Sequence, residues 1–411
     1  MKRPGTVVLA TFLLAVLARP AGAMTPIDPD GMTGTVKHLS GKEFMGRAAG
    51  SRELDHVAAL IAGRFEAVGL LPGGTQNGSW YQEWTDPELK VKMRNVVGIL
   101  PGRGEHAGQA IVIGAHYDHL GMGMFGALKE NQGKLHPGAD DNASGVAVLM
   151  EMASRLPLVP DMERTIVFVA FTGEEAGRRG SRYFVQNEKR YPVSKTIGMI
   201  NLDTVGRMEK NRLIVLGTGS AQEWSTIFRD LSKGQKLEIV ETTQDLDASD
   251  QKSFHEAGVP AVQLFTGANL DYHRPTDRFD KINGAGLVKV ATLVRDVVFY
   301  LANHPAPLTP TVFASPGAAP PRGDRKVTIG MVPDFTYNGT GVRLSGTTPG
   351  GPAENGGMQE GDVVILVGTT KVMVLKDLSD ALKAAQPGDK VPVRFLRNGR
   401  EMKTTVEVKE R

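Results

Sequence analysis

The chain contains no cysteine among its 411 residues, so no disulfide can stabilise its fold. An excess of one charge is also missing, because 48 basic residues stand against 45 acidic ones and give a formal net charge of +3. There is no long basic run and no interleaving of basic and aromatic side chains, which disfavours nucleic-acid binding. A hydrophobic content of 41% is ordinary for a globular enzyme and predicts a sizeable buried core.

No apolar run at the N-terminus is long enough to span a membrane. The segment MKRPGTVVLATFLLAVLARPAGA carries Lys2 and Arg3, then an apolar run from about Thr6 to Leu17, then the small residues 21–23. The run is shorter than the roughly 20 residues of a spanning helix, and the pattern is typical of a cleavable export signal. We therefore expect residues 1–23 to be removed and the protein to be periplasmic or secreted; an uncleaved anchor is the alternative.

The pattern over 24–302 predicts one α/β domain. Apolar side chains at helical spacing, namely Val57, Leu60, Ile61, Phe65 and Val68, predict an amphipathic helix. Short β-rich apolar runs then alternate with helical segments, at 95–100, 109–116, 164–172, 196–203, 212–217 and 260–266. Such runs indicate a mostly parallel mixed sheet sandwiched by helices.

The composition changes at 303–324, which is rich in Pro, Ala and Gly and is predicted to be an extended linker. Residues 325–411 have the length of one small domain, with several β-like runs and a helix predicted over 377–385. We find no internal repeat in the sequence.

Polar residues follow the predicted strands, and ligands of open α/β sheets bind beyond the carboxyl ends of strands. His116 ends one strand, and Asp118 follows where it can accept the second N–H of a metal-bound imidazole. The segment PGADDNASG at 137–145 precedes a helix predicted from about Ala143 to Arg155, with Asn142 as a plausible N-cap. Taken alone, each motif also fits an ordinary polar loop.

Two adjacent carboxylates, Glu174 and Glu175, directly follow a predicted buried strand. There they repel each other and lose hydration unless a cation is present. Because adjacent side chains diverge, one can bind a metal while the other carries a proton. Asp203 ends the next strand, and His273 lies in a polar loop beside Tyr272. A lone loop histidine is more often simply exposed to solvent.

Together these positions provide two imidazoles and three carboxylates after successive elements of one sheet: His116, Asp141, Glu175, Asp203 and His273. Such a ligand set suits a pair of borderline divalent ions such as Zn²⁺. Each ion would take one histidine and one terminal carboxylate, with one aspartate bridging them. Two cations about 3.5–4 Å apart can share a water, lower its pKa to about neutral and polarise a carbonyl.

In this order the motifs resemble the secreted bacterial di-zinc aminopeptidases of metallopeptidase family 28, in the zinc-exopeptidase superfamily that also contains glutaminyl cyclases. The resemblance covers roughly residues 40–300 and rests on GAHYDHLG, PGADDNASG, FTGEEAGRRGS, NLDTVGR, SDQKSFHEAGVPAV and YHRPTD. It implies the zinc-exopeptidase fold and hydrolysis of N-terminal residues of peptides by a metal-bridging hydroxide. The implied ligands are His116 and Asp203 on one zinc, Glu175 and His273 on the other, and Asp141 between them.

The resemblance implies further roles at matching positions. Glu174 falls on the general acid/base, which takes the proton of the attacking water and delivers it to the leaving amine. Asp118 falls on the carboxylate behind the first histidine ligand. Tyr272 is a candidate donor to the oxyanion, or only a wall residue. A cis peptide is implied at Asp141–Asn142.

Three features of the chain limit this assignment. Where many relatives have Ser-Asp-His, this chain has Ser249-Asp250-Gln251, so a role for the third position is in doubt. Only some forty residues, about 70–109, separate the first helix from the metal strands, and the protease-associated insert of many relatives is predicted to be absent. Asp140 has no assigned role, because only its neighbour matches the bridging position.

The C-terminal region resembles a PDZ domain of the bacterial periplasmic-protease type, most specifically in GGPAENGGMQEGD. PDZ domains bind extended peptide ends by strand addition and hold the carboxylate on loop N–H groups. On this resemblance we expect that loop near Thr328 to Met331. A PDZ-shaped module that only packs against the catalytic domain is the alternative.

The sequence therefore predicts a metallo-aminopeptidase with two zinc ions, peptide substrates, a possible peptide ligand at the PDZ domain and no nucleic-acid partner. One alternative is a glutaminyl cyclase-like transferase with a single zinc, which the retention of all five ligands and of the Glu174–Glu175 pair disfavours. The other is a non-catalytic peptide-binding scaffold. The residue that binds the substrate amine is not assigned.

Overall fold

The computed structural model describes residues 26–124, 126–311, 327–335, 337 and 339–410. The predicted export signal at 1–23 and most of the predicted linker at 303–324 lie outside these residues, so both stay predictions. None of the described helices is both long and apolar enough to cross a membrane.

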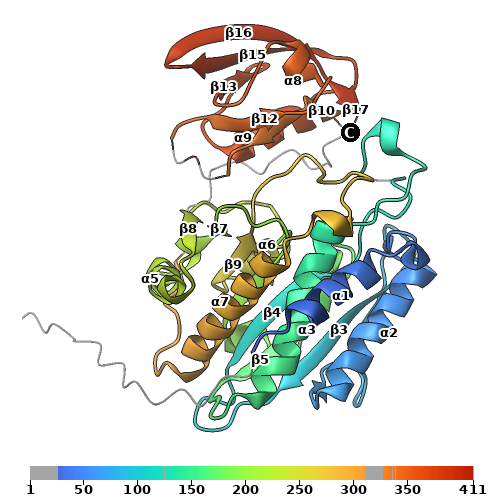
Figure 1. Cartoon of the computed structure of the whole chain (residues 1–411), viewed down its shortest axis with the longest axis vertical. Coiled ribbons are helices and arrows are strands. Elements are labelled where there is room, and N and C mark those ends of the chain that lie inside the picture. Colours follow the sequence, from blue (N-terminus) through green and yellow to red (C-terminus); the bar gives the residue numbers. More distant parts are fainter. Residues whose placement is uncertain (1–25, 125, 312–326, 336, 338, 411) are drawn as a thin grey trace, which may run out of the picture.

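A nine-stranded mixed sheet forms the centre of the N-terminal domain (Figure 1). Its strands are β1 (Leu71–Pro72), β2 (Tyr81–Thr85), β3 (Lys92–Leu100), β4 (Ala110–His116), β5 (Thr165–Phe171), β6 (Thr196–Leu202), β7 (Arg212–Leu216), β8 (Glu238–Thr242) and β9 (Ala261–Phe265). They lie in the order β1-β3-β5-β4-β6-β9-β7-β8, with β2 paired to β3.

The sheet is parallel at its centre and antiparallel towards its β1–β3 side and between β9 and β7. Strand β4 pairs in parallel with β5 and β6, and β6 pairs in parallel with β9, whereas β3 and β7 are antiparallel to their neighbours β5 and β9. Every residue of β4, β5, β6 and β9 is buried, so both faces of these strands are covered. The predicted mixed α/β fold is confirmed.

Helices cover both faces of this sheet. The larger core lies under α1 (Pro29–Leu39), α2 (Arg52–Ala67), α3 (Gly145–Arg155), α5 (Trp224–Leu231) and α7 (Gly284–Asn303). A second core on the other face contains Phe184 of α4 (Arg179–Asn187) and Phe254 of α6 (Gln251–Glu256).

The predicted amphipathic helix is α2, but the prediction that Leu60 lies on its buried face is wrong. Val57, Ile61 and Phe65 are fully buried, whereas Leu60 is 42% exposed. An α-helix turns about 100° per residue, so Leu60 lies beside the buried face that Val57, Ile61 and Phe65 share. Leu54, one turn earlier, takes the place on the buried face.

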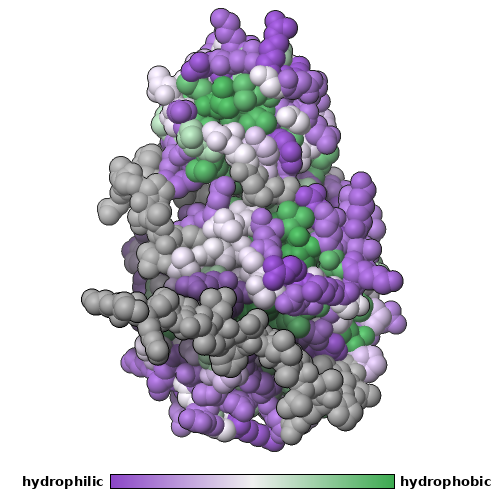
Figure 2. All heavy atoms as spheres, turned by 90° about the vertical axis from the view of Figure 1, so that its left-hand side faces the viewer, coloured by the Kyte–Doolittle hydropathy of each residue, from purple (hydrophilic) through white to green (hydrophobic). Residues whose placement is uncertain are grey.

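The C-terminal domain has a core of its own. Its elements are β10 (Val327–Thr328), β11 (Met331–Pro333), β12 (Val342–Thr347), α8 (Pro352–Asn355), β13 (Val363–Val367), β14 (Thr370–Lys371), α9 (Leu375–Lys383), β15 (Lys390–Arg397), β16 (Arg400–Glu407) and β17 (Lys409–Glu410). The helix predicted over 377–385 is α9. A bidentate bond from Arg397 to the buried carboxylate of Asp362, at 2.8 and 2.7 Å, joins β15 to the start of β13. Figure 2 shows hydrophobic side chains gathered on one face of this domain, surrounded by hydrophilic ones.

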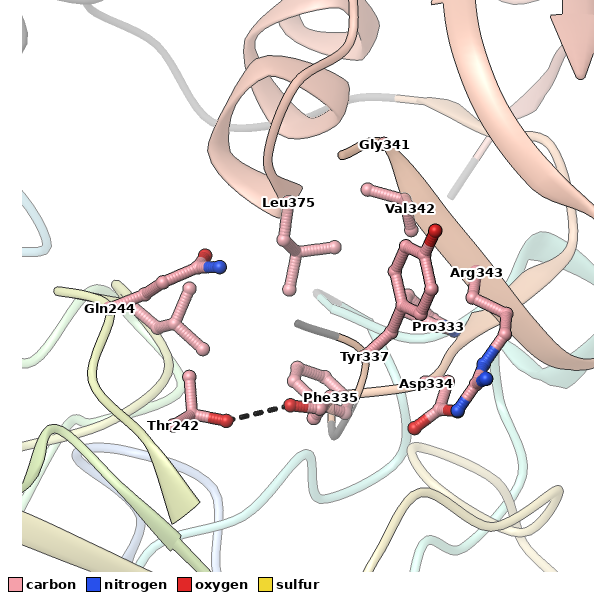
Figure 3. A pocket seen from close by; sticks show the side chains of 11 residues that line it. Thr242, Gln244, Pro333, Asp334, Phe335, Tyr337, Gly341, Val342, Arg343 and Leu375 are labelled. Atoms are coloured by element: carbon pink, nitrogen blue, oxygen red, sulfur yellow. Dashed lines mark hydrogen bonds and ion pairs between the residues drawn. The ribbon is translucent and has the colours of Figure 1, made fainter. Parts of the chain in front are cut away.

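Among the described residues, the C-terminal domain contacts the N-terminal domain around Phe335 and through an ion pair of Lys129. On one side the Thr242 hydroxyl donates to the Phe335 carbonyl at 2.7 Å (Figure 3), and the Phe335 ring packs edge-on against Phe265 with ring centres 5.4 Å apart. On the other side Lys129 pairs with Glu410 at 2.9 Å. The apolar contact around Phe335 also contains Leu246 and Leu375, one from each domain.

We predict that Phe335→Ala loosens this domain contact. The substitution removes the ring between the domains and should cost the docked arrangement about 1–2 kcal/mol of apolar contact. Small-angle X-ray scattering should show a larger radius of gyration. Met373→Ala is the matched control, since Met373 is 40% exposed on the C-terminal domain. Scattering curves for Phe335→Ala that superimpose on those of the wild type would contradict the prediction.

Candidate metal centre

The parallel arrangement of β4, β5 and β6 brings three predicted ligands to one edge of the sheet. His116 is the last residue of β4, Glu175 follows the end of β5, and Asp203 directly follows β6. The carboxyl ends of parallel strands lie at the same edge, so these side chains converge there.

His116 forms the first half of the site. Its Nε2 lies 3.2 Å from Asp141 Oδ1 and 3.5 Å from Asp203 Oδ1. Its Nδ1 lies 3.2 Å from the backbone carbonyl of Asp118, and the Asp118 carboxylate is 3.8 Å away. Nδ1–H therefore donates to the carbonyl of Asp118 and leaves Nε2 for a metal. The carboxylate of Asp118 instead accepts the backbone N–H groups of Glu174 and Glu175.

His273 forms the second half. Its Nε2 lies 3.2 Å from Asp141 Oδ2 and 3.0 Å from Glu175 Oε2. Its Nδ1 lies 3.1 Å from the carbonyl of Gly126, which again leaves Nε2 for a metal. The two oxygens of Asp141 thus face different histidines, as a bridging carboxylate requires.

These distances fit zinc. Ligand atoms bonded to one tetrahedral Zn²⁺ at about 2.0–2.2 Å lie roughly 3.2–3.6 Å apart. Of the imidazole-to-carboxylate distances above, 3.2, 3.2 and 3.5 Å lie in this range, and the His273–Glu175 distance of 3.0 Å is slightly shorter. Asp141 Oδ2 is buried and accepts no hydrogen bond from the described residues. The site therefore has the donor set of a metal centre, and all five predicted ligands are brought together; their roles stay predictions.

His119 was missed by the sequence analysis, although it lies within the motif GAHYDHLG. Its ring is fully buried, and Nδ1 lies 2.7 Å from Glu175 Oε1. His119, Asp141 and Glu175 also form a group whose donor atoms are mutually within 4.8 Å. Both the motif and the spacing were visible in the sequence, but nothing there showed that this ring reaches Glu175.

The loop that carries Asp141 is held by Arg47, another residue that the sequence analysis missed. The buried guanidinium donates to the carbonyls of Leu39 and Pro137 at 2.7 Å, of Gly138 at 3.0 Å and of Tyr117 at 3.1 Å. Burial lowers the pKa of Arg47 to about 10, although nearby Asp141 and Asp118 favour its charge. Arg47 therefore ties the loop after β4 to the loop before α3.

Asp277 supports the same loop from the other side. Its carboxylate accepts the backbone N–H groups of Asp140 and Asp141, each at 3.0 Å, and a bond from Arg207 at 3.2 Å. The Asp141–Asn142 peptide is cis, as the family resemblance implied. The Asn142 side chain accepts the N–H of Gly145 at 3.0 Å, so the regular helix α3 begins at Gly145 and not at the predicted Ala143.

Asp140 has a structural part in this loop. Its carboxylate accepts the Gly206 N–H at 2.7 Å and the Asn269 amide at 3.2 Å, which joins the loop to two other segments of the site. Burial raises the pKa of Asp140 well above its usual range, and the charge of Asp277 raises it further.

The electrostatics separate the two adjacent glutamates. Burial raises the pKa of Glu174 well above its usual range; His116 opposes this, and Asp250 and Glu175 add to it. Burial also favours neutral Glu175, but the charge of His273 and the bond from His119 lower the pKa of Glu175 to about 2. One carboxyl group is thus held as an anion beside the histidines while the other is poised to exchange a proton.

The imidazoles act as counter-charges for the remaining carboxylates. Burial opposes the charge of His273, yet Glu175 and Asp141 raise the pKa of His273 to about 10. Burial likewise disfavours ionised Asp141, but His119, His116 and His273 lower the pKa of Asp141 well below its usual range. A divalent cation would take over this role and release the protons of the histidines.

Tyr272 stacks on His273, with ring centres 4.0 Å apart and planes at 20°, and is 47% exposed. Its ring thus forms part of the rim of the site. The geometry fits either predicted role, as a wall residue or as a donor to the substrate.

The mixed α/β sheet thus carries two histidine–carboxylate groups at its carboxyl edge, an arrangement suited to binding divalent metal ions. Residues 95–298 match the model of peptidase family M28, and residues 329–408 match the model of the PDZ domain. The chain therefore contains a peptidase family M28 domain and a C-terminal PDZ domain.

Individual relatives agree with this result. Aminopeptidase YwaD of Bacillus subtilis (strain 168) is 28% identical over 240 residues, which are 54% of this chain and 49% of that protein. The structure of BSAP, a zinc aminopeptidase from Bacillus subtilis, has a TM-score of 0.55 at 19% identity and covers 71% of this chain and 97% of its own. Bacteroides thetaiotaomicron glutaminyl cyclase bound to N-acetylhistamine has a TM-score of 0.55 at 20% identity and covers 67% and 99%.

These structural similarities, at such low identity, show the fold alone. The chain spans about half the length of the curated relatives it matches, 49% of one and 59% of another.

We predict that Arg47→Met destabilises the folded protein. Four buried carbonyls lose their donor, which should lower the free energy of unfolding by at least about 3 kcal/mol. Thermal unfolding followed by circular dichroism measures the change. Arg52→Met, at the exposed start of α2, is the control and should melt like the wild type. Equal melting temperatures for the two variants would contradict the assigned role of Arg47.

We also predict that Asp250 makes the stability of the folded protein depend on pH. Its two carboxylate oxygens are buried and accept no hydrogen bond of good geometry from the described residues. Burial raises the pKa of Asp250 to about 7. Because this value lies above that of an unfolded aspartate, the stability that protonated Asp250 contributes is present below about pH 4 and lost as the pH rises through 7.

In chelator, Asp250→Asn should therefore unfold like the wild type at pH 4 and be more stable at pH 8, by on the order of 1–3 kcal/mol. Denaturant titrations at both pH values measure this difference. A variant less stable than the wild type at pH 8 would show that the Asp250 anion stabilises the fold.

Proposed function

We propose that the protein is a di-zinc aminopeptidase. The observation that carries this proposal is Asp141, whose two oxygens face His116 and His273 at 3.2 Å each, with Glu174 beside the ligand Glu175. The family M28 domain and the aminopeptidases among its relatives support the same reaction.

His116, Asp203, Asp141, Glu175 and His273 would hold the two ions. When bound, the ions would supply a water of near-neutral pKa and polarise the scissile carbonyl. Glu174 would take the proton of the attacking water and deliver it to the leaving amine, for which its raised pKa is suited. Tyr272, stacked on His273 at the rim, would donate to the carbonyl oxygen as negative charge develops.

A cavity of about 440 Å³ lies between the two domains, and none of the five predicted ligands lines it. Its walls include Thr266 and Asn269 of the catalytic domain and Pro333 and Phe335 of the PDZ domain. Asn269 also donates to Asp140 at 3.2 Å, so the cavity adjoins the loop that carries the bridging aspartate. The volume is that of a typical small-ligand site, within about 300–1,000 Å³.

For the PDZ domain we propose the binding of a peptide C-terminus at 328–331. The turn between β10 and β11 contains Gly330 with a φ of +68°, which lets successive backbone groups line a tight loop. A fluorescent peptide should bind with a free C-terminal carboxylate and lose affinity when amidated. Equal binding of both forms would contradict recognition of the carboxylate, and binding of neither form would favour a domain that only packs against the N-terminal domain.

We further propose that the protein is exported, on the basis of the N-terminal sequence pattern alone. Expression in a Gram-negative host followed by cell fractionation tests this. Recovery in the cytoplasm with residues 1–23 still attached would refute it.

The glutaminyl cyclase alternative shares the fold, and fold similarity does not separate the two functions. The paired imidazoles around Asp141 favour two ions and hence the peptidase. Cyclisation of N-terminal glutamine substrates without hydrolysis of aminoacyl anilides would reverse this choice.

We predict that Glu174→Gln abolishes peptidase activity but retains metal. The amide cannot accept the proton of the water, so kcat on aminoacyl anilides should fall by at least about 10²-fold, while metal content stays at the wild-type level. Glu66→Gln, on the exposed face of α2, is the control. Wild-type activity should also vanish in chelator and return with zinc. Full activity in Glu174→Gln, or in excess chelator, would contradict the proposal.

A further inference from the structure

We infer that His119 is a positioning residue for the second metal site: its Nδ1–H donates to Glu175 Oε1 and so directs Glu175 Oε2 toward the ion that His273 binds. The inference rests on the proposed di-zinc function and assigns a role to a residue outside the five ligands.

The two oxygens of Glu175 face different imidazoles. Oε2 lies 3.0 Å from His273 Nε2, slightly shorter than the separation of two ligands of one zinc ion. Oε1 lies 2.7 Å from His119 Nδ1, which is the length of a charge-assisted hydrogen bond. The carboxylate is therefore oriented from both ends.

The distances also argue against His119 as a ligand, although it belongs to a group of possible donors. Ligand atoms on one tetrahedral zinc lie roughly 3.2–3.6 Å apart. His119 Nδ1 is closer than this to Glu175, at 2.7 Å, and farther than this from Asp141 Oδ2, at 3.9 Å. His273 Nε2 comes nearer to this range on both sides, at 3.2 Å from Asp141 Oδ2 and 3.0 Å from Glu175 Oε2.

The backbone and a glycine fix the position of the His119 ring. The His119 N–H donates to the Arg47 carbonyl at 3.0 Å, which places the ring beside the segment that also supports the Asp141 loop. A side chain at Gly138 would put its Cβ 2.5 Å from His119 Cδ2, so the glycine allows the loop to pack against the ring. Nε2 is buried and has no hydrogen-bond partner among the described residues, so the bond to Glu175 is the one hydrogen bond of the ring.

Zinc affinity tests this assignment independently of catalysis. Three variants are compared with the wild type in a competition titration against a zinc-binding dye: His119→Leu removes the donor, His119→Asn keeps an amide N–H near the position of Nδ1, and His136→Leu is the control. His136 is a second buried imidazole of this region, but its Nδ1 contacts the carbonyl of Lys134 and no carboxylate.

We expect His119→Leu to raise one of the two zinc dissociation constants by about 10–100-fold, the usual effect of losing an outer partner of a ligand. The other constant should stay within about threefold, because the His119 ring forms its hydrogen bond with Glu175 and lies 3.9 Å from Asp141, the one residue that both halves share. His119→Asn should recover most of the affinity, and His136→Leu should keep both constants.

Two results would overturn the inference. Unchanged affinities in His119→Leu would show that the bond does not position Glu175. An equal loss in His119→Asn and His119→Leu would show that His119 binds the metal, since the amide replaces the hydrogen bond but not a zinc–nitrogen bond. If the leucine variant fails to fold, His119→Asn and His119→Gln form the test, because the glutamine amide lies at the Nε2 position and should not rescue.

The titration distinguishes a failure of the proposed function from a failure of the role assigned to His119. A wild-type chain without a second zinc site overturns both proposals at once, whereas two normal sites in His119→Leu overturn only the role of His119.

Discussion

Burial of several carboxylates at one edge of the sheet is the constraint on which the rest of the site depends. Asp118, Asp141, Glu175 and Asp203 all lie within a few residues of strand or helix ends and are largely shielded from solvent. Like charges in a poorly solvated site cost free energy unless cations balance them. The histidines do this in part, as the raised pKa of His273 and the lowered pKa of Glu175 show. Two divalent ions would do so fully.

The loops at this edge of the sheet contain groups that stabilise the buried carboxylates. Arg47 donates its hydrogen bonds to four backbone carbonyls and to no carboxylate. Its positive charge therefore stabilises the Asp118 and Asp141 anions from a distance, and their oxygens stay available to a metal. Asp277 and Asp140 accept backbone N–H groups that would otherwise be buried without partners. Asp141, the proposed bridging residue, is thus held in place through its backbone N–H, and both of its carboxylate oxygens stay available to metal ions.

The sequence predicted those parts of the site that follow from local pattern. His116 and Asp203 follow largely apolar runs, and each run locates the strand end and hence the edge of the sheet. His273 comes from a loop with no periodicity, and only the ordered family motifs connected it to the others. The parallel centre of the sheet was predictable for the same reason as the strand ends, because buried parallel strands are largely apolar. The antiparallel pairings of β1, β2, β3 and β7 were not predicted.

Other features depend on contacts between distant segments and carry no local signal. Arg47 follows a short 3₁₀ turn and resembles any surface arginine until the fold buries it. His119 differs from a loop histidine only by its distance to Glu175, which is 56 residues away in the chain. Strand β8 at the sheet edge contains two glutamates, Glu238 and Glu241, and is not a continuous apolar run. The contact of Phe335 with Phe265 joins two domains. Burial and proximity in three dimensions decide these roles, and neither can be read from a single segment.

The central claim is that Asp141 bridges two cations, and anomalous X-ray scattering at the zinc edge from crystals grown with zinc tests it most directly. The account predicts two peaks on either side of Asp141, one beside His116 and Asp203 and the other beside Glu175 and His273. A single peak, or peaks away from these side chains in an otherwise unchanged fold, would contradict it.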